Sequence, residues 1–137
     1  MCIRDRFPSL WITREFAGPF LHLAVYDSSS RIIGFQVESD LAQTTSEGYA
    51  GPVPIRVFLD ASAAVLGFDI LPCDETPGYL ELTVKALTPR LVGYSPARTD
   101  TVDAVTTATL SSSAVIAAVT GAARRVANEV VSRANEQ

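Results

Sequence analysis

The chain has 137 residues, of which 47% are hydrophobic and 19% are charged. This length fits one domain with a single core, and the composition is that of a globular rather than a disordered chain. The net charge of −4 argues against nucleic-acid binding, which requires a basic surface, and no apolar run approaches the roughly 18–20 residues that span a bilayer.

The first six residues, MCIRDR, match nothing that follows and resemble a translated adaptor sequence. We therefore expect residues 1–6 to be non-native and leave them out of the reasoning about the fold. Residues 7–137 then form a single domain, which we expect to be a fragment of a larger protein. Without Cys2, one cysteine remains at Cys73, so an internal disulfide is not expected.

Two pairs of apolar, β-branched and aromatic segments predict an antiparallel sheet. In the third segment, Ile55, Val57 and Leu59 alternate with other residues, which indicates a strand with one buried face. Residues 40–54 between the two pairs contain glycines and prolines and are predicted to be a connecting loop. Four strands joined as consecutive hairpins need no parallel crossover. The segments are 20–27, 31–38, 53–59 and 65–71.

His22 is the only histidine, and no cysteine pair stands at ligand spacing. These residue types argue against a metal site. We expect the His22 side chain to point outward from its strand, opposite Leu21 and Leu23.

A turn at 74–79 and a short helix over 80–87 are predicted after the fourth strand. Pro77 suits a turn or the first position of a helix. Pro89, Gly93 and Pro96 then predict a looser connection.

A long helix is predicted at the C-terminus, because apolar residues recur there at spacings of three and four. Hydroxyl side chains cluster where this helix begins, and they can accept hydrogen bonds from its unpaired N–H groups. The same N–H groups and the helix dipole also favour a phosphate. On spacing alone, a simple N-cap is the plain interpretation. The apolar residues are Val115, Val119, Ala122, Val126 and Val130, and the hydroxyl residues are Thr106, Thr107, Thr109, Ser111, Ser112 and Ser113.

The stretch VDAVTTATLSSSAVIAAV resembles the flavin-attachment motif of the FMN-binding domain family, which reads roughly D-x-x-[ST]-G-A-T-x-[ST]. That family includes flavin-carrying components of the sodium-pumping NADH:quinone reductase and of the Rnf complex, and the N-terminal domain of NosR-type regulators. The resemblance implies that FMN is joined through its phosphate to Thr109. The other matching positions are Asp103, Thr106, Ala108 and Ser111, whereas Thr107 stands where the family has glycine.

Two further segments carry the same resemblance. E-T-P-G, a second signature that the family places near the isoalloxazine ring, is matched letter for letter by Glu75, Thr76, Pro77 and Gly78. Tyr79 takes a place often held by leucine, and it would either stack on the flavin or simply pack. The segment DASAA at 60–64 resembles a D-x-x-G turn between the corresponding family strands.

The resemblance implies a covalent FMN electron-transfer domain in a membrane-associated redox complex or regulator, on the extracytoplasmic side of the membrane. A separate flavin transferase would install the FMN, and other redox subunits or domains would exchange electrons with it. The protein would then be an electron carrier rather than a stand-alone enzyme. Two alternatives stay open: a degenerate module without covalent flavin, which Thr107 favours, and a soluble enzyme with dissociable FMN.

Overall fold

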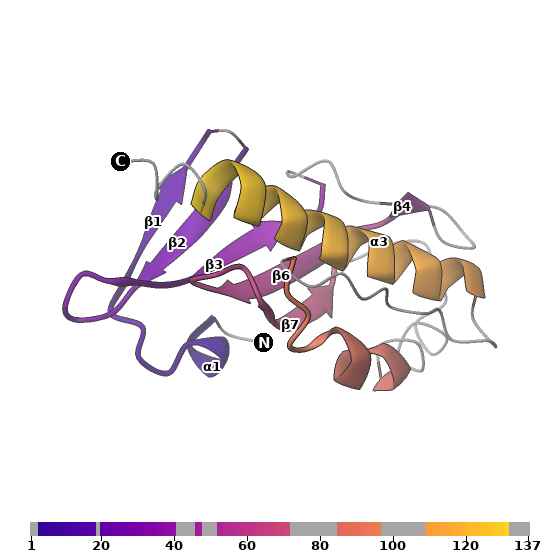
Figure 1. The fold of residues 1–137 in the computed structure, drawn as a ribbon, viewed down its shortest axis with the longest axis horizontal. Coiled ribbons are helices and arrows are strands. Elements are labelled where there is room, and N and C mark those ends of the chain that lie inside the picture. Colours follow the sequence, from indigo (N-terminus) through magenta and orange to yellow (C-terminus); the bar gives the residue numbers. More distant parts are fainter. Residues whose placement is uncertain are drawn as a thin grey trace.

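A five-stranded antiparallel sheet with a long helix along one face forms the main part of the structure (Figure 1). The computed structural model describes residues 3–18, 20–40, 46–47, 52–71, 85–96 and 109–131. Each strand pairs antiparallel with its neighbour, so the predicted α+β fold built from consecutive hairpins is confirmed. In spatial order the strands are β1 (Ile12–Phe16), β2 (His22–Tyr26), β3 (Ile32–Glu38), β6 (Ile55–Asp60) and β7 (Val65–Ile70).

Helical segments lie on both sides of this sheet. The predicted C-terminal helix is α3 (Thr109–Val126), and a π-helical turn, η2 (Ala127–Val131), continues it. Residues 85–91 form a short helix, and α1 (Ile3–Arg6) lies near the N-terminus. A small two-stranded ribbon pairs β4 (Ser46–Glu47) with β5 (Pro52–Val53).

The structure differs from the sequence-based expectations in three elements. Strand β1 was not predicted, because all five of its side chains are exposed and its apolar signal is weak. The predicted loop 40–54 contains the β4–β5 ribbon, and the strand predicted over 53–59 is interrupted at Pro54, which has no N–H group to donate to a ladder. The short helix includes Pro89, which we expected to lie in a looser connection.

The main core lies between α3 and the sheet. Strand residues 55, 57 and 59 of β6 point toward the helix, as their alternation predicted, and all three are fully buried. Leu87 and Leu91 of the short helix join the same core, and their burial outweighs the backbone hydrogen bond that Pro89 forfeits.

The other face of the sheet carries a smaller apolar cluster of Phe7, Val25 and Phe58. Phe7 fits there because Gly34 has no side chain; a Cβ at Gly34 would clash with the Phe7 ring. The neighbouring guanidinium of Arg6 lies 5.5 Å from the centroid of the Phe58 ring. The N-terminal residues therefore cover part of this face.

The loops of the β2–β3 and β6–β7 hairpins have the same hydrogen-bonding pattern. In each loop an aspartate Oδ1 accepts hydrogen bonds from the backbone N–H groups two and four residues later, at 2.9–3.0 Å. The third residue after each aspartate has a positive φ, 62° at Ser30 and 69° at Ala63. The aspartates are Asp27 and Asp60. A positive φ favours glycine, which gives a physical reason for the glycine of the D-x-x-G turn that 60–63 resembles.

We predict that Ser30→Gly stabilises the fold by about 0.5–1 kcal/mol, because glycine adopts this backbone conformation without a Cβ clash. Ser28→Gly in the same exposed loop is the matched control, since φ at Ser28 is not positive. The control should lose about 0.5–1 kcal/mol through backbone entropy. Thermal unfolding measures both variants, and equal shifts in the same direction would contradict the loop geometry.

Candidate functional site

The N-terminus of α3 is the centre of the candidate site. The helix begins at Thr109, and it contains no acidic residue in its first turn. Backbone N–H groups and the positive end of the dipole at a helix start favour an anion such as a phosphate, and no acidic side chain of the first turn opposes one here.

Small side chains let α3 lie close against the sheet. Alanines at 114, 118, 122 and 123 share the buried face with fully buried valines at 115, 119 and 126. Burying each valine side chain contributes roughly 1.5–3 kcal/mol. Packing of residues 114–126 thus fixes the position of this part of the helix against the sheet.

The helix also packs against the β4–β5 ribbon, in addition to β6 and β7. Figure 1 shows the N-terminal end of α3 and β4 at the same end of the molecule, whereas the C-terminal end of α3 lies near β1 and β2. The ribbon therefore lies against α3 on the side of the helix's N-terminal end. The sequence analysis missed this proximity, and strands of two residues leave no periodic signal that would have revealed it.

Hydrogen bonds join the ends of β3 and β7 to the start of β6. Ser39 is fully buried; its backbone N–H donates to the Ile55 carbonyl, and its Oγ accepts from the Ile55 N–H, both at 2.8 Å. On the other side, the Leu71 N–H donates to the Pro54 carbonyl at 2.9 Å. Leu71, the last described residue before the segment that contains E-T-P-G, is thereby held beside Pro54.

The predicted site residues fall into two groups. Thr109 and Ser111 lie in the first turn of α3. The others are outside the described residues, so the structure does not test whether the two motifs meet. Those others are Asp103, Thr106, Thr107, Ala108, Glu75, Thr76, Pro77, Gly78 and Tyr79.

His22 is buried, so the prediction that it points outward was wrong. Its ring faces the α3 side of the sheet, stacked on Phe16 with centroids 5.5 Å apart, and its Nδ1 donates to the Phe20 carbonyl at 2.8 Å. Arg125 of α3 lies 4.6 Å from the Phe20 ring centroid, and its hydrogen bond with Glu129 raises the pKa of the guanidinium. The expectation failed because alternation puts His22 on the face opposite Leu21 and Leu23 but does not tell which of the two faces α3 covers.

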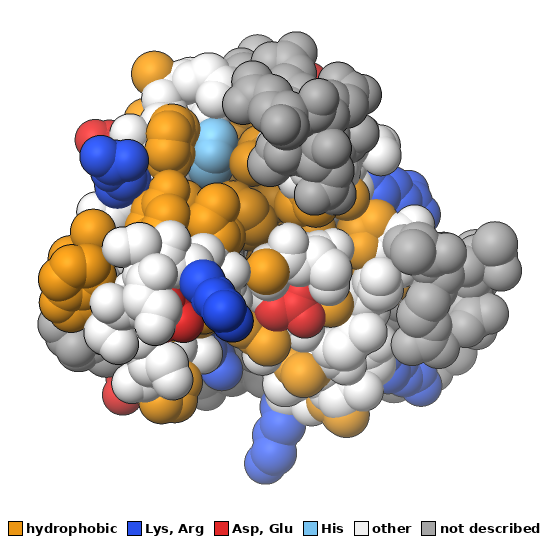
Figure 2. Space-filling model, turned by 60° about the vertical axis from the view of Figure 1, so that its left-hand side comes forward, with side chains coloured by type: hydrophobic (Ala, Val, Ile, Leu, Met, Phe, Trp, Pro, Cys, Tyr) orange, Lys and Arg blue, Asp and Glu red, His pale blue; other side chains and the backbone are white. Residues whose placement is uncertain are grey.

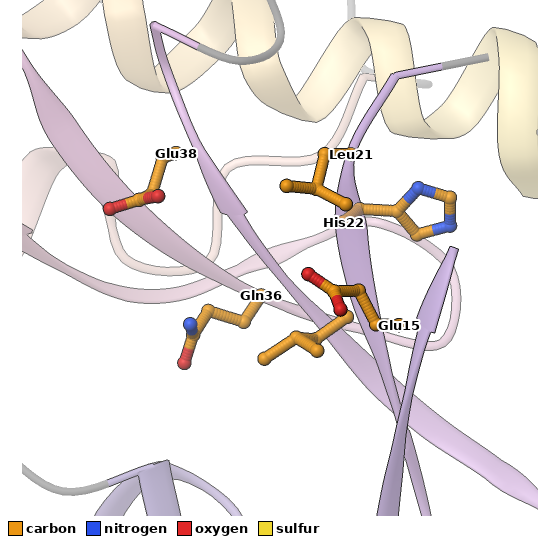
Figure 3. Close-up of a pocket in the computed structure, with 6 residues that line it drawn as sticks. Glu15, Leu21, His22, Gln36 and Glu38 are labelled. Carbon is orange, nitrogen blue, oxygen red and sulfur yellow. The ribbon is translucent and has the colours of Figure 1, made fainter. Parts of the chain in front are cut away.

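A shallow hollow of about 120 Å³ lies on the sheet face away from α3 (Figure 3). Leu21, Leu23, Glu15, Gln36 and Glu38 line it, together with His22. Ligand pockets usually occupy about 300–1,000 Å³, so this hollow is too small for a flavin ring. It is also formed by residues outside both predicted motifs, and we do not assign the cofactor to it.

The described part of the chain holds neither a metal cluster nor a membrane-spanning helix. No group of three or more His, Cys, Asp or Glu side chains among the described residues is placed to hold a metal ion. None of the described helices has the length and apolarity to cross a membrane.

Comparison with known proteins identifies a family for this chain. The family model of the FMN-binding domain matches residues 48–124, more than half of the chain. The match begins at the residue after β4 and runs through most of α3. No curated protein matches the chain.

We predict that Ser39→Ala destabilises the protein by about 1–3 kcal/mol, because the buried Ile55 N–H loses its acceptor. Ser62→Ala is the control, since it removes a hydroxyl whose hydrogen bond to Asp60 is exposed, and we expect a change within about 0.5 kcal/mol. Urea unfolding monitored by circular dichroism gives both values. Equal midpoints for the two variants would show that the Ser39 bond does not hold the strand ends.

Proposed function

Because this chain belongs to the FMN-binding domain family, we propose that it carries its FMN covalently, as a phosphoester on Thr109, and works as an electron-transfer domain. The observation that carries the proposal is the start of α3 at Thr109, within the matched region. A phosphate on this residue would lie at the end of the helix where unpaired N–H groups are expected.

The electrostatics at this helix end suit a phosphodiester. An anion at a helix N-terminus is typically stabilised by about 0.3–1 kcal/mol, and the absence of acidic residues from the first turn avoids an opposing repulsion. The basic residues at the far end, Arg124 and Arg125, complement the negative end of the dipole. The described part of the chain therefore fits the group that the family binds.

The protein has a positioning role in this proposal. Bound FMN supplies the redox chemistry, while the chain supplies attachment, orientation and the local electrostatic environment. Thr109 is a tether, and a separate flavin transferase forms the bond between its hydroxyl and the FMN phosphate. The packing of α3 holds the tether in place relative to the sheet.

The setting of this activity is also proposed. The family resemblance supports a membrane-associated redox complex or regulator, with the domain on the extracytoplasmic side and further redox subunits as electron partners. The competing candidate is a module without covalent flavin that acts through protein contacts. Thr107 favours that candidate, because the family has glycine there and a β-branched residue resists the backbone conformations that glycine permits.

We predict that the protein co-expressed with a flavin transferase gains the mass of one FMN less one water, and that Thr109→Ala abolishes the gain. The fold should survive this change, because the described buried residues 114–126 of α3 are unaffected and loss of a hydroxyl near a helix start costs at most about 1–2 kcal/mol. Intact-mass spectrometry is the measurement, with Thr120→Ala as a control threonine in the same helix. Covalent flavin on the Thr109→Ala protein would refute the assignment.

We also predict that Thr107→Gly raises the flavinylated fraction when the transferase is limiting. Glycine would let the cofactor or the transferase approach the backbone more closely. We expect this effect on the loading rate to exceed the effect of glycine's backbone entropy, which costs roughly 0.5–1 kcal/mol. The measurement is yellow colour retained in the acid-precipitated protein over a time course. Colour lost to the supernatant would indicate dissociable FMN, and no loading of either form would favour the module without flavin.

A further inference from the structure

Two surfaces outside the candidate site carry groups that the proposed function does not use. Hydrophobic side chains gather around His22 on the side of the molecule that Figure 2 shows. The sheet face away from α3 instead combines an aromatic ring, a carboxylate and a glycine on two neighbouring strands. Phe58 of β6 lies directly opposite Gly67 of β7, and Asp69 lies two residues further along β7 on the same face. This second surface holds a charged group, the guanidinium of Arg6.

The Arg6 guanidinium contacts all three members of this cluster. Arg6 belongs to α1, across the sheet from α3 (Figure 1), and its Nη2 is 3.7 Å from Asp69 Oδ1. Its Cζ lies 5.5 Å from the centroid of the Phe58 ring. A Cβ at Gly67 would clash with the guanidinium, so this group occupies space that only glycine leaves open. A carboxylate, an aromatic ring and a flat opening together suit a planar cation.

The fit of Arg6 to this cluster is incomplete. A guanidinium can bind a carboxylate through two parallel N–H···O bonds, but 3.7 Å is longer than a hydrogen bond. Arg6 Nε and Asp69 Oδ2 are buried, and neither has a hydrogen-bond partner in the described part of the chain. Arg56 is the cross-strand neighbour of Asp69, and its Nη2 lies 3.5 Å from Glu38 Oε1 on its other side. Asp69 therefore retains an oxygen for a further N–H donor.

We propose that Phe58, Gly67 and Asp69 bind the arginine side chain of a partner polypeptide, and that Arg6 occupies this site in the present chain. Arg6 is one of the six residues that we expect to be non-native, so we assign the site to the sheet and not to Arg6. The carboxylate matches the charge of a guanidinium, the ring attracts it, and an arginine that is free to adjust closes both hydrogen bonds to Asp69. Lysine offers a compact charge and cannot form this two-point pair. The inference does not depend on the flavin.

Binding of N-acetyl-arginine amide to the full chain tests the proposal. Arg6→Ala vacates the site and leaves the three sheet residues in place. Two-dimensional NMR of this variant should show saturable shifts of the backbone signals of residues 58, 67 and 69. The parent chain should bind the probe about fivefold or more less tightly, because its own Arg6 competes for the site. N-acetyl-lysine amide should bind the Arg6→Ala chain more weakly than the arginine probe does, because it cannot form the two-point pair.

Two substitutions in the Arg6→Ala chain test the assigned residues. Gly67→Ala should weaken binding about fivefold or more, because its methyl group fills the space of the guanidinium. The atoms nearest to the added Cβ belong to the Arg6 side chain, which this variant lacks, so the fold should be retained. Gly18→Ala is the matched control, since a Cβ there has nothing within 4 Å. Asp69→Asn should weaken binding to a similar extent, because it removes the charge and keeps the shape.

Circular dichroism identifies which variants are folded, and each of the two substitutions tests the site independently of the other. Saturable binding to the Arg6→Ala chain that a folded Gly67→Ala or Asp69→Asn variant loses would support the proposal. No binding of the arginine probe to the Arg6→Ala chain, or equal binding to the parent chain, would overturn it. Undiminished binding to either substituted chain in its folded form would equally overturn it, because the probe would then lie elsewhere. Equal binding of the arginine and lysine probes would overturn the assignment to a guanidinium.

Discussion

Close packing of α3 against β6 is the constraint on which the rest of the structure depends. The helix presents alanine and valine to the sheet, and β6 presents fully buried residues at 55, 57 and 59. Interiors are packed as densely as organic crystals, so a helix seated on such a surface has little freedom to slide or turn. Residues 114–126 of α3 therefore have a defined position, and the candidate attachment threonine is the first residue of the same helix.

The two ends of α3 lie beside different parts of the sheet. The N-terminal end of α3 lies with the β4–β5 ribbon, while its C-terminal end lies near β1 and β2 (Figure 1). Arg125 fastens the latter end through its contact with the Phe20 ring.

Local patterns predicted the parts of the fold that carry a strong periodic signal. The four strands β2, β3, β6 and β7 and the helix α3 were all predicted, because their apolar residues recur with the period of the element. Strand β1 was not predicted because its residues are exposed on both faces. Pro89 was expected outside a helix, but burial of Leu87 and Leu91 outweighs the tendency of proline to interrupt one. His22 was misplaced because alternation separates the two faces of β2, but tertiary packing decides which of them α3 covers.

The candidate site was predicted more from motif resemblance than from local physics. A cluster of hydroxyls before a helix is as typical of an ordinary N-cap as of a phosphate site. The family match is the observation that favours a flavin. Peptide mapping of the protein co-expressed with a flavin transferase tests this central claim most directly. Trypsin should release residues 99–124 as one peptide, and fragmentation on either side of Thr109 locates the modification. The account predicts FMN on Thr109; an unmodified peptide, or FMN on Thr106 or Thr107, would contradict it.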